Sequence, residues 1–385
     1  MMPLLRQTIN GELWWSSLAR HFDLVGLTAP FTSHILLVGN KRSLGSPLFP
    51  RQIETTVTSL CVDLDVAGVV NGHTLLPFYE PFLSAAKIYK ALACMSGNGN
   101  AEFALGLAAM GDYPTHLKGC ADCIEEDHRL HGTAVWKTAL QTPGAIVCHR
   151  HKRPLCSSNV SARVKNQIAH FVTADQAEYE PTAPIPKKIL PDALWLAEAG
   201  QTLLVKHPSM PGPARLTALY RYHLEKLEYI DSFGRLQLAE LMPAFIKRLG
   251  RLMTLIQCEP PIENARDNWL ARLARYPRSE QSPVKHLLMI RFLNLDALAA
   301  LDEAAAMLPY SAPCSFCTPA SKRSARITEE KIQWHRKQWL KLRAKHSDGS
   351  LRQNADTLYS WLWRNDRSWL RYYARSATKS DVAKI

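Results

Sequence analysis

The sequence lacks a long apolar segment and contains few cysteines. No apolar run reaches the about 18 residues that a membrane-spanning helix needs, and the polar and acidic side chains near the start do not form a secretory signal. Nine cysteines among 385 residues are sparse and odd in number, which excludes a disulfide scaffold of the kind found in small secreted domains. We therefore expect a cytoplasmic protein, with its thiols reduced.

The sequence also lacks the common motifs of catalysis. It contains no GxxxxGK(S/T) phosphate-binding loop, no GxSxG nucleophile turn and no HExxH motif. Gly97 and Gly99 do not complete a dinucleotide-binding fingerprint, because a third glycine and a preceding strand are missing. The acidic residues form no obvious triad of metal ligands on strands. These absences predict a protein that is not an enzyme.

Basic charge is plentiful, and it is concentrated near the C-terminus. The chain has a net charge of +13, and residues 321–380 hold +10 of it, with 15 Lys and Arg against 5 Asp and Glu. Five of the ten tryptophans also lie there. One interpretation is a solvated basic helix face over a small aromatic core. The other, which the scarcity of neutralising acids favours, is a nucleic-acid-binding segment.

Hydrophobic periodicity predicts a mainly α fold. Hydrophobic residues make up 46% of the chain, which is enough for a folded core. Their spacing predicts helices over residues 8–21, 82–95, 101–110, 193–206, 214–230, 236–256, 265–275, 284–292, 296–307 and 328–345. We therefore expect a multidomain protein with helix-turn-helix-type domains and an embedded small zinc-finger module.

Two proline-rich segments, 179–192 and 309–323, suggest linkers. Together with the shifts in composition they predict six segments. These are an N-terminal domain over 1–112, a zinc-finger module over 113–160, a linker over 161–192, a helical domain over 193–308, a second linker over 309–325, and a basic helical segment over 326–385.

Two pairs of metal-binding side chains give the sharpest local signal. Cys120 and Cys123 are separated by two residues, and so are Cys148 and His151, after an intervening loop. Each pair can hold one side of a tetrahedral Zn²⁺ ion, and four protein ligands leave no open position for water or substrate. The spacing therefore predicts one structural zinc site. Two unrelated thiol pairs, or a redox CxxC, are the alternatives, and no thioredoxin-like pattern supports the latter.

Other cysteines and histidines are weaker candidates for metal binding. Nearby side chains that could compete are His128, His131, His149 and Cys156. Cys314 and Cys317 form a second CxxC without a matching pair, because His335 and His346 are irregularly placed. The remaining cysteines, Cys61, Cys94 and Cys258, lie in apolar contexts that predict burial.

Two segments could form helix-turn-helix units. In residues 214–256 Gly234 lies at a possible turn, and the second helix would carry Arg235, Lys247, Arg248 and Arg251. In residues 327–373 a helix over 328–345 is followed by the polar turn 346–350 and by a helix that begins near Arg352.

The cysteine-rich stretch resembles the signature of the TniQ/TnsD family. The matching features are the two ligand pairs, Trp136 before the loop, Pro143-Gly144 ahead of the third ligand, and the closing CxxH. The helix around Glu12 and Arg20 is similar to the family's opening.

Two further segments point to the TnsD branch. Residues 73–82 (HTLLPFYEPF) resemble its N-terminal motif, and residues 358–370 (LYSWLWRNDRSWL) resemble its C-terminal LYxWLYRHDRxWL motif. Trp363 and Asn365 replace the usual Tyr and His of that motif. TnsD proteins usually continue past it, whereas this sequence ends at Ile385, so some DNA contacts of longer relatives would be missing.

The resemblance implies a bacterial target-site selector of Tn7-type transposons. Such a protein binds double-stranded DNA at a chromosomal attachment site, distorts it, and recruits an AAA+ ATPase regulator that in turn brings the transposase. It would be associated with the nucleoid when bound to DNA. The DNA-contacting residues that we expect are Arg352, Arg364, Arg367 and Arg371, then Lys337, Lys341 and Arg343.

Alternatives to this function remain open in the sequence. One is a TniQ-type adaptor that links an RNA-guided CRISPR effector to the transposition machinery, and another is a zinc-containing transcription regulator. At the level of the site, Asp366 could pair with Arg364 or Arg367 within its helix, which would give those arginines a structural role.

Overall fold

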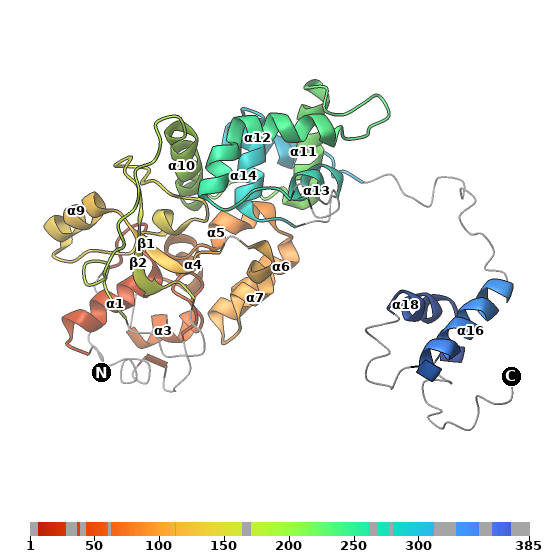
Figure 1. The fold of residues 1–385 in the computed structure, drawn as a ribbon. Coiled ribbons are helices and arrows are strands. Elements are labelled where there is room, and N and C mark those ends of the chain that lie inside the picture. Colours follow the sequence, from red (N-terminus) through yellow and green to blue (C-terminus); the bar gives the residue numbers. More distant parts are fainter. Residues whose placement is uncertain are drawn as a thin grey trace. The chain divides into compact units, whose positions relative to one another are not determined.

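The computed structural model describes residues 7–27, 37–38, 44–60, 63–111, 113–163, 171–261, 268–276, 280–311, 329–345 and 356–370. The chain forms two compact units, Met1–Ala312 (unit 1) and Pro313–Ile385 (unit 2). Helices predominate in both, and the two strands lie in unit 1 (Figure 1). Within the described ranges, no helix combines the length and apolar character needed to cross a membrane.

The N-terminal part of unit 1 consists of short helices. They are α1 (Trp14–Leu24), α3 (Ile53–Leu60), α4 (Val66–His73), α5 (Leu76–Tyr79), the 3-10 helix η1 (Glu80–Phe82), α6 (Ala85–Ser96), α7 (Ala101–Leu105) and α8 (Leu107–Met110). The predicted helix 8–21 starts later than expected, because Leu13 is extended and Gly11 has a φ of +74°. The predicted helix 101–110 is broken at Gly106, whose φ of +76° is left-handed.

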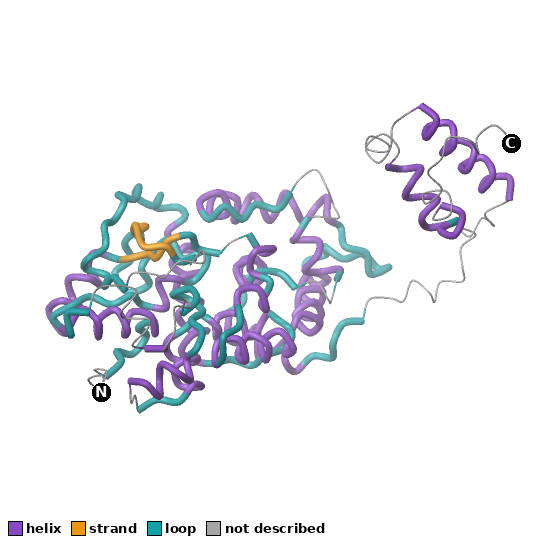
Figure 2. The backbone as a smooth tube through the Cα atoms, turned by 90° about the horizontal axis from the view of Figure 1, so that it is seen from below, coloured by secondary structure: helices purple, strands orange, loops and turns teal. Residues whose placement is uncertain are grey.

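A small two-stranded sheet follows, and Figure 2 shows it in orange among loops. The elements of this part are β1 (His116–Gly119), α9 (Ala121–His131), the 3-10 helix η2 (Thr138–Gln141) and β2 (Cys156–Ser161). The strands are antiparallel, with Gly119 opposite Cys156.

Longer helices complete unit 1. They are α10 (Leu190–Lys206), α11 (Gly212–Lys226), α12 (Leu238–Leu255), α13 (Trp269–Arg275), α14 (Pro283–Phe292) and α15 (Ala297–Ala306). Their positions confirm the mainly α prediction. One hydrophobic cluster runs from Leu13 to Ala304, so the N-terminal helices, the sheet region and α10–α15 share a continuous core.

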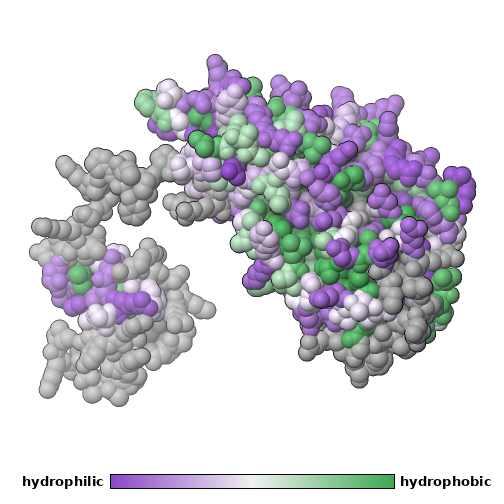
Figure 3. All heavy atoms as spheres, turned by 180° about the vertical axis from the view of Figure 1, so that it is seen from behind, coloured by the Kyte–Doolittle hydropathy of each residue, from purple (hydrophilic) through white to green (hydrophobic). Residues whose placement is uncertain are grey.

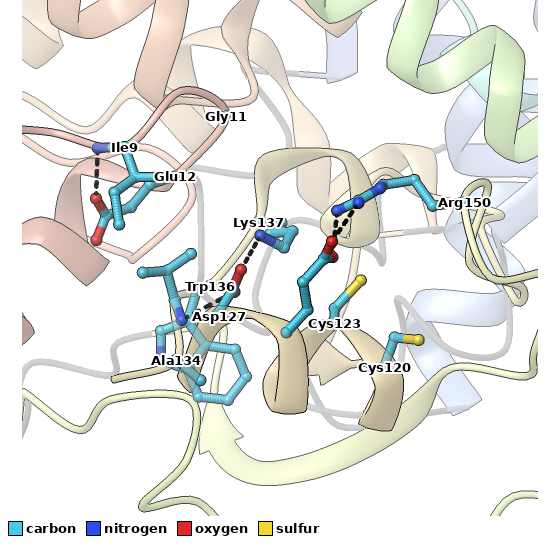
Figure 4. A network of polar contacts seen from close by, with 12 residues as sticks. Ile9, Gly11, Glu12, Cys120, Cys123, Asp127, Ala134, Trp136, Lys137 and Arg150 are labelled. Atoms are coloured by element: carbon cyan, nitrogen blue, oxygen red, sulfur yellow. Dashed lines mark hydrogen bonds and ion pairs between the residues drawn. The ribbon is translucent and has the colours of Figure 1, made fainter. Parts of the chain in front are cut away.

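Three sequence motifs meet beside α1. The buried Glu12 carboxylate accepts hydrogen bonds from Arg20 Nε and Nη2, each at 2.8 Å. It also accepts one from the Ile9 amide at 3.0 Å (Figure 4). The Glu12 carbonyl lies 2.7 Å from His73 Nδ1, and the next amide, that of Leu13, donates to the Trp136 carbonyl at 2.8 Å. These contacts fix the cysteine-rich region against the N-terminal helices.

Unit 2 is built from α16 (Glu329–Lys345) and α18 (Asp356–Asn365), with residues 367–370 again helical. Trp339, Leu362 and Leu370 are buried between these helices. This core is small and aromatic.

Candidate metal centre and nucleic-acid interface

The two-stranded sheet brings the two predicted ligand pairs together. Cys120 directly follows β1 and Cys123 lies in the first turn of α9, while the second pair comes just before β2. Gly119 and Cys156 are opposite each other in the sheet. The segment that begins at Cys120 and the segment that ends just before Cys156 therefore meet at the same end of the sheet. Tyr179 packs on Gly119 so closely that a Cβ atom there would overlap its ring.

A tight turn presents the second ligand pair. The Lys152 amide donates to the Cys148 carbonyl and the Cys148 amide donates to the Arg153 carbonyl, both at 2.8 Å. Lys152 has a φ of +57°, and the His151 amide donates to Cys148 Sγ at 3.4 Å. The turn therefore folds the histidine ring back onto the cysteine.

A lysine on strand β1 binds the backbone on both sides of the Pro143-Gly144 turn. Lys118 Nζ donates to the Thr142 and Ala145 carbonyls at 3.0 and 2.8 Å, and burial lowers the pKa of this lysine to about 7. Gly144 has a φ of +79° and lies against Leu196 and Val284. The turn ahead of the third ligand thus docks onto α10 and α14.

The four predicted ligands form one compact cluster that could hold a metal ion. Their ligand atoms all lie within 4.8 Å of one another. Cys123 Sγ is 3.7 Å from Cys148 Sγ, and His151 Nδ1 is 3.6, 3.3 and 3.7 Å from the sulfurs of Cys120, Cys123 and Cys148. Tetrahedral bonds of about 2.3 Å to sulfur and about 2.0 Å to nitrogen place the ligand atoms about 3.5–3.8 Å apart. The donor set and its spacing therefore fit a zinc-sized ion.

The three thiols of the cluster shift one another's pKa values. Hydrogen bonding with Cys120 and Cys148, together with burial, raises the pKa of the Cys123 thiol, whereas hydrogen bonds from Cys120 and Cys123 lower the pKa of Cys148. Three adjacent sulfurs cannot all ionise without a compensating positive charge. A metal ion held by these residues would supply that charge and favour the deprotonated thiols.

Charged side chains next to the ligands join the two halves of the cluster. Arg150 binds the Glu126 carboxylate through two contacts of 2.8 Å, and Arg153 Nε lies 2.9 Å from Asp122 Oδ2. His151 Nε2 lies 4.0 Å from Glu126 Oε2, and hydrogen bonding from Arg150 keeps the pKa of Glu126 low. Sequence reasoning missed these pairs, although acids within and just after the first ligand pair, and arginines within and just after the second, were a visible signal.

A second anchor lies at the back of α9. The Asp127 carboxylate accepts a hydrogen bond from Lys137 Nζ at 2.7 Å and one from the Val135 amide at 3.4 Å (Figure 4). Helix α9, which carries Cys123, is thereby fixed to the segment from Val135 to Lys137.

The competing candidates lie elsewhere. His128 binds Asp175, with Nε2 2.9 Å from Oδ2. His131 ends α9 and is exposed, Cys156 begins β2, and His149 is half-buried outside the cluster, where burial lowers its pKa. Cys94 and Cys258 pack with the hydrophobic core. Cys61, Cys314, Cys317 and His346 lie outside the described residues, and His335 stacks on Trp361 at 3.5 Å.

The predicted DNA-contacting residues fall into three groups. Lys337, Lys341 and Arg367 belong to the described part of unit 2 and are exposed. Arg343 and Arg364 lie on α16 and α18, but their side chains fall outside the described part, and Arg352 and Arg371 lie outside the described residues altogether. For these residues DNA contact stays a prediction.

Asp366 has a different partner from the one considered in the sequence. Its Oδ2 atom lies 2.6 Å from Arg336 Nε on α16. Arg367 instead places its guanidinium over the ring of Trp363, with Cζ 4.3 Å from the ring centroid. The described contacts of Asp366 are therefore with Arg336 and not with Arg367, so an ion pair with Asp366 does not give Arg367 a structural role.

A long connection joins the two helices of the helix-turn-helix unit predicted in residues 214–256, and that unit stays a prediction. Residues 227–237 separate α11 from α12, which is longer than the three or four residues of a typical helix-turn-helix turn. Arg235 lies in that connection and binds Asp231 at 2.8 Å, and Arg248 donates to the Phe292 carbonyl at 3.1 Å. Lys247 and Arg251 are exposed on α12.

Comparisons with known proteins agree with this arrangement. The TniQ family model matches residues 5–155, which include all four cluster residues, and the model for Tn7-like transposition protein D matches residues 196–318. The transposon Tn7 transposition protein TnsD of Escherichia coli is 22% identical over 388 residues, covering 97% of this chain and 74% of that protein. The chain therefore belongs to the TniQ/TnsD family.

Proposed function

We propose that this protein selects the target site for a Tn7-like transposon by binding a specific sequence of double-stranded DNA. Its place in the TniQ/TnsD family supports a role in target selection. A non-catalytic function is in keeping with that role. The match of residues 196–318 to transposition protein D favours a selector that binds DNA by itself over an adaptor for an RNA-guided complex.

The exposed cations of unit 2 are the observation that carries the DNA-binding part. Lys337 and Lys341 are four residues apart on α16, whereas Trp339 faces the core, so the two lysines lie on the outer side of the helix. The described residues of unit 2 that are visible in Figure 3 are predominantly hydrophilic. Such a surface suits phosphate contacts from lysine and arginine.

The cluster of Cys120, Cys123, Cys148 and His151 would hold one structural Zn²⁺ ion. When bound, the ion supplies a four-coordinate crosslink between the N-terminal end of α9 and the turn before β2. Since that region also binds the first helix of unit 1 through Trp136, the crosslink would stabilise the N-terminal half of the unit.

Recruitment of an AAA+ ATPase regulator, and through it of the transposase, rests on the family relationship. We place this contact in the N-terminal region that the TniQ model matches. Unit 2 would then hold the DNA while unit 1 meets the protein partner.

Binding measured against salt concentration tests the electrostatic part. Each phosphate contact contributes about 0.9 to the slope of log affinity against log salt. We expect the double variant Lys337→Gln/Lys341→Gln to reduce the slope by about 1–2. Lys247→Gln/Arg251→Gln makes the same charge change on exposed residues of unit 1 and should leave the slope unchanged. Equal slopes for all three proteins would contradict the assignment to unit 2.

A further inference from the structure

The outer side of α16 carries an exposed tryptophan beside two lysines. Trp334 is 56% exposed, and Lys337 and Lys341 are exposed as well. The lysines follow the tryptophan by three and seven residues, which is the spacing of one side of a helix. Trp339 lies on the other side, in the core of unit 2. The indole of Trp334 therefore shares a surface with the lysines that we assign to phosphate contacts.

The Trp334 indole has an open ring face. Among the described rings, His335 is the one in contact with it, with centroids 4.8 Å apart and an interplanar angle of 76°. A ring that meets another at nearly a right angle covers at most one of its two faces. His335 in turn stacks on Trp361 at 3.5 Å, and Trp361 packs against the core. The indole thus has a fixed neighbour and leaves at least one flat apolar face open.

The other tryptophans of residues 321–380 have packing partners within unit 2. Each is buried, packs against the core, or lies between the side chains of the same helical segment, and they are Trp339, Trp361, Trp363 and Trp369. Trp334 does not belong to that core. An indole left in water forgoes the free energy that its burial would contribute. A ligand that covers Trp334 would recover this free energy.

The charges around Trp334 suit a nucleic acid. In the described part of unit 2 the ion pair joins Arg336 to Asp366, and neither Lys337 nor Lys341 takes part in one. Along the helix axis the two lysines lie about 4.5 and about 10 Å from Trp334, which lets their long side chains reach the phosphates on either side of one nucleotide. A flat apolar face beside two cations therefore matches a base with its flanking phosphates.

We propose that the open face of Trp334 stacks on an unpaired DNA base while Lys337 and Lys341 bind the phosphates that flank this base. This inference rests on the DNA binding proposed above and specifies the form of the DNA. In a regular duplex each base is stacked between its neighbours, so a side chain on the protein surface cannot cover it. Unit 2 therefore binds DNA with unpaired bases more tightly than regular duplex.

The test compares a short regular duplex with the same duplex carrying a bulge of unpaired thymines. The full chain is titrated into each labelled DNA at one salt concentration, and affinity is measured by fluorescence anisotropy. We expect the bulged duplex to bind about tenfold more tightly, which is the size of effect that stacking of one base on an aromatic ring produces. Equal affinity for the two DNAs, or weaker binding of the bulged one, would overturn the inference.

Two substitutions at the same position separate stacking from the other effects of a bulge. Trp334→Leu should bind the bulged and the regular duplex with equal affinity, because it keeps an apolar side chain but loses the flat ring. Trp334→Phe is the matched control and should keep most of the preference, because a smaller aromatic ring still stacks. Survival of the preference in Trp334→Leu would overturn the inference and leave the exposed indole to a protein ligand. Its complete loss in Trp334→Phe would also overturn it.

A measurement on the unaltered protein covers the case in which a variant does not fold. A 2-aminopurine placed in the bulge should lose fluorescence on binding as it stacks on the indole, and a rise or no change would overturn the inference. Failure of the protein to bind either DNA would refute the proposed DNA-binding function and the stacking site with it. Equal binding to both DNAs refutes only the stacking site.

Discussion

Arg336 and Asp366 connect the two helical segments of unit 2, with Nε 2.6 Å from Oδ2. The Asp366 side chain is only 8% exposed, and the same guanidinium lies over the Trp369 ring at 5.2 Å. One arginine therefore neutralises the motif aspartate and covers the motif tryptophan. This arrangement gives Asp366 a structural role and leaves the Arg367 guanidinium over the Trp363 ring.

Removal of the arginine from this pair should destabilise unit 2. Arg336→Ala leaves a buried carboxylate without its counter-charge, at a cost of about 2 kcal/mol after allowance for the partial exposure of the arginine. Urea denaturation followed by tryptophan fluorescence measures this effect. Arg367→Ala removes the same side chain from an exposed position and should shift the midpoint much less. Equal shifts in the two variants would contradict the structural role.

The histidine ligand can be distinguished from its neighbour by metal analysis. The protein purified with zinc should contain about one zinc ion per chain through four protein ligands, and Cys120→Ser or His151→Ala should lower that content sharply. His149→Ala is the control, because His149 lies outside the cluster and its loss should not change the stoichiometry. Unchanged zinc content in His151→Ala would refute the ligand assignment.

The carboxylate beside the histidine ligand should tune metal affinity. Glu126→Gln removes the negative charge 4.0 Å from His151 Nε2 and weakens the contact with Arg150. Loss of such an outer partner typically costs about 10- to 100-fold in metal affinity, which competition with a chelator can measure. Glu125→Gln makes the same change at the adjacent exposed position and should have little effect. A similar affinity in both variants would count against the role of Glu126.

A buried histidine in unit 1 should make stability depend on pH. Burial lowers the pKa of His286 from 6.5 to about 3, and its Nδ1 atom lies 2.8 Å from the Tyr220 hydroxyl. Between these pH values the unfolded chain binds a proton that the folded chain does not. The free energy of unfolding therefore falls as pH decreases from 6.5 toward 3, by about 1.4 kcal/mol per unit from this group.

The variant His286→Phe isolates that contribution. Phenylalanine keeps the ring stacked against Phe82, whose centroid is 5.0 Å from that of the histidine. Chemical denaturation at a series of pH values should give a smaller slope for the variant than for the unaltered protein, at equal zinc loading. Equal slopes of unfolding free energy against pH in the two proteins would show that folding does not keep His286 unprotonated.

The parts of this structure that depend on local spacing could be predicted from the sequence. The ligand pairs of the metal cluster are each defined within four residues, and the long amphipathic helices α10 and α12 begin and end near their expected positions.

Contacts between distant segments could not be predicted in the same way. The pairing of Asp366 with Arg336 depends on how α16 packs against α18. The intrahelical candidates Arg364 and Arg367 are two residues and one residue from Asp366, and residues at these spacings do not face each other on a helix. The Glu12 network joins residues 61 and 125 positions away. The connection between α11 and α12 shows a further limit: Gly234 does mark a turn, but the hydrogen bonds of Asp231 extend that turn into a longer loop.

Footprinting on genomic DNA fragments tests the central claim most directly. If the protein selects one target site by binding DNA, nuclease protection should appear at a single position, at protein concentrations where other fragments stay unprotected. The protection should weaken with salt and with Lys337→Gln/Lys341→Gln. Absence of protection on every fragment, or uniform protection without a preferred site, would contradict a sequence-specific selector.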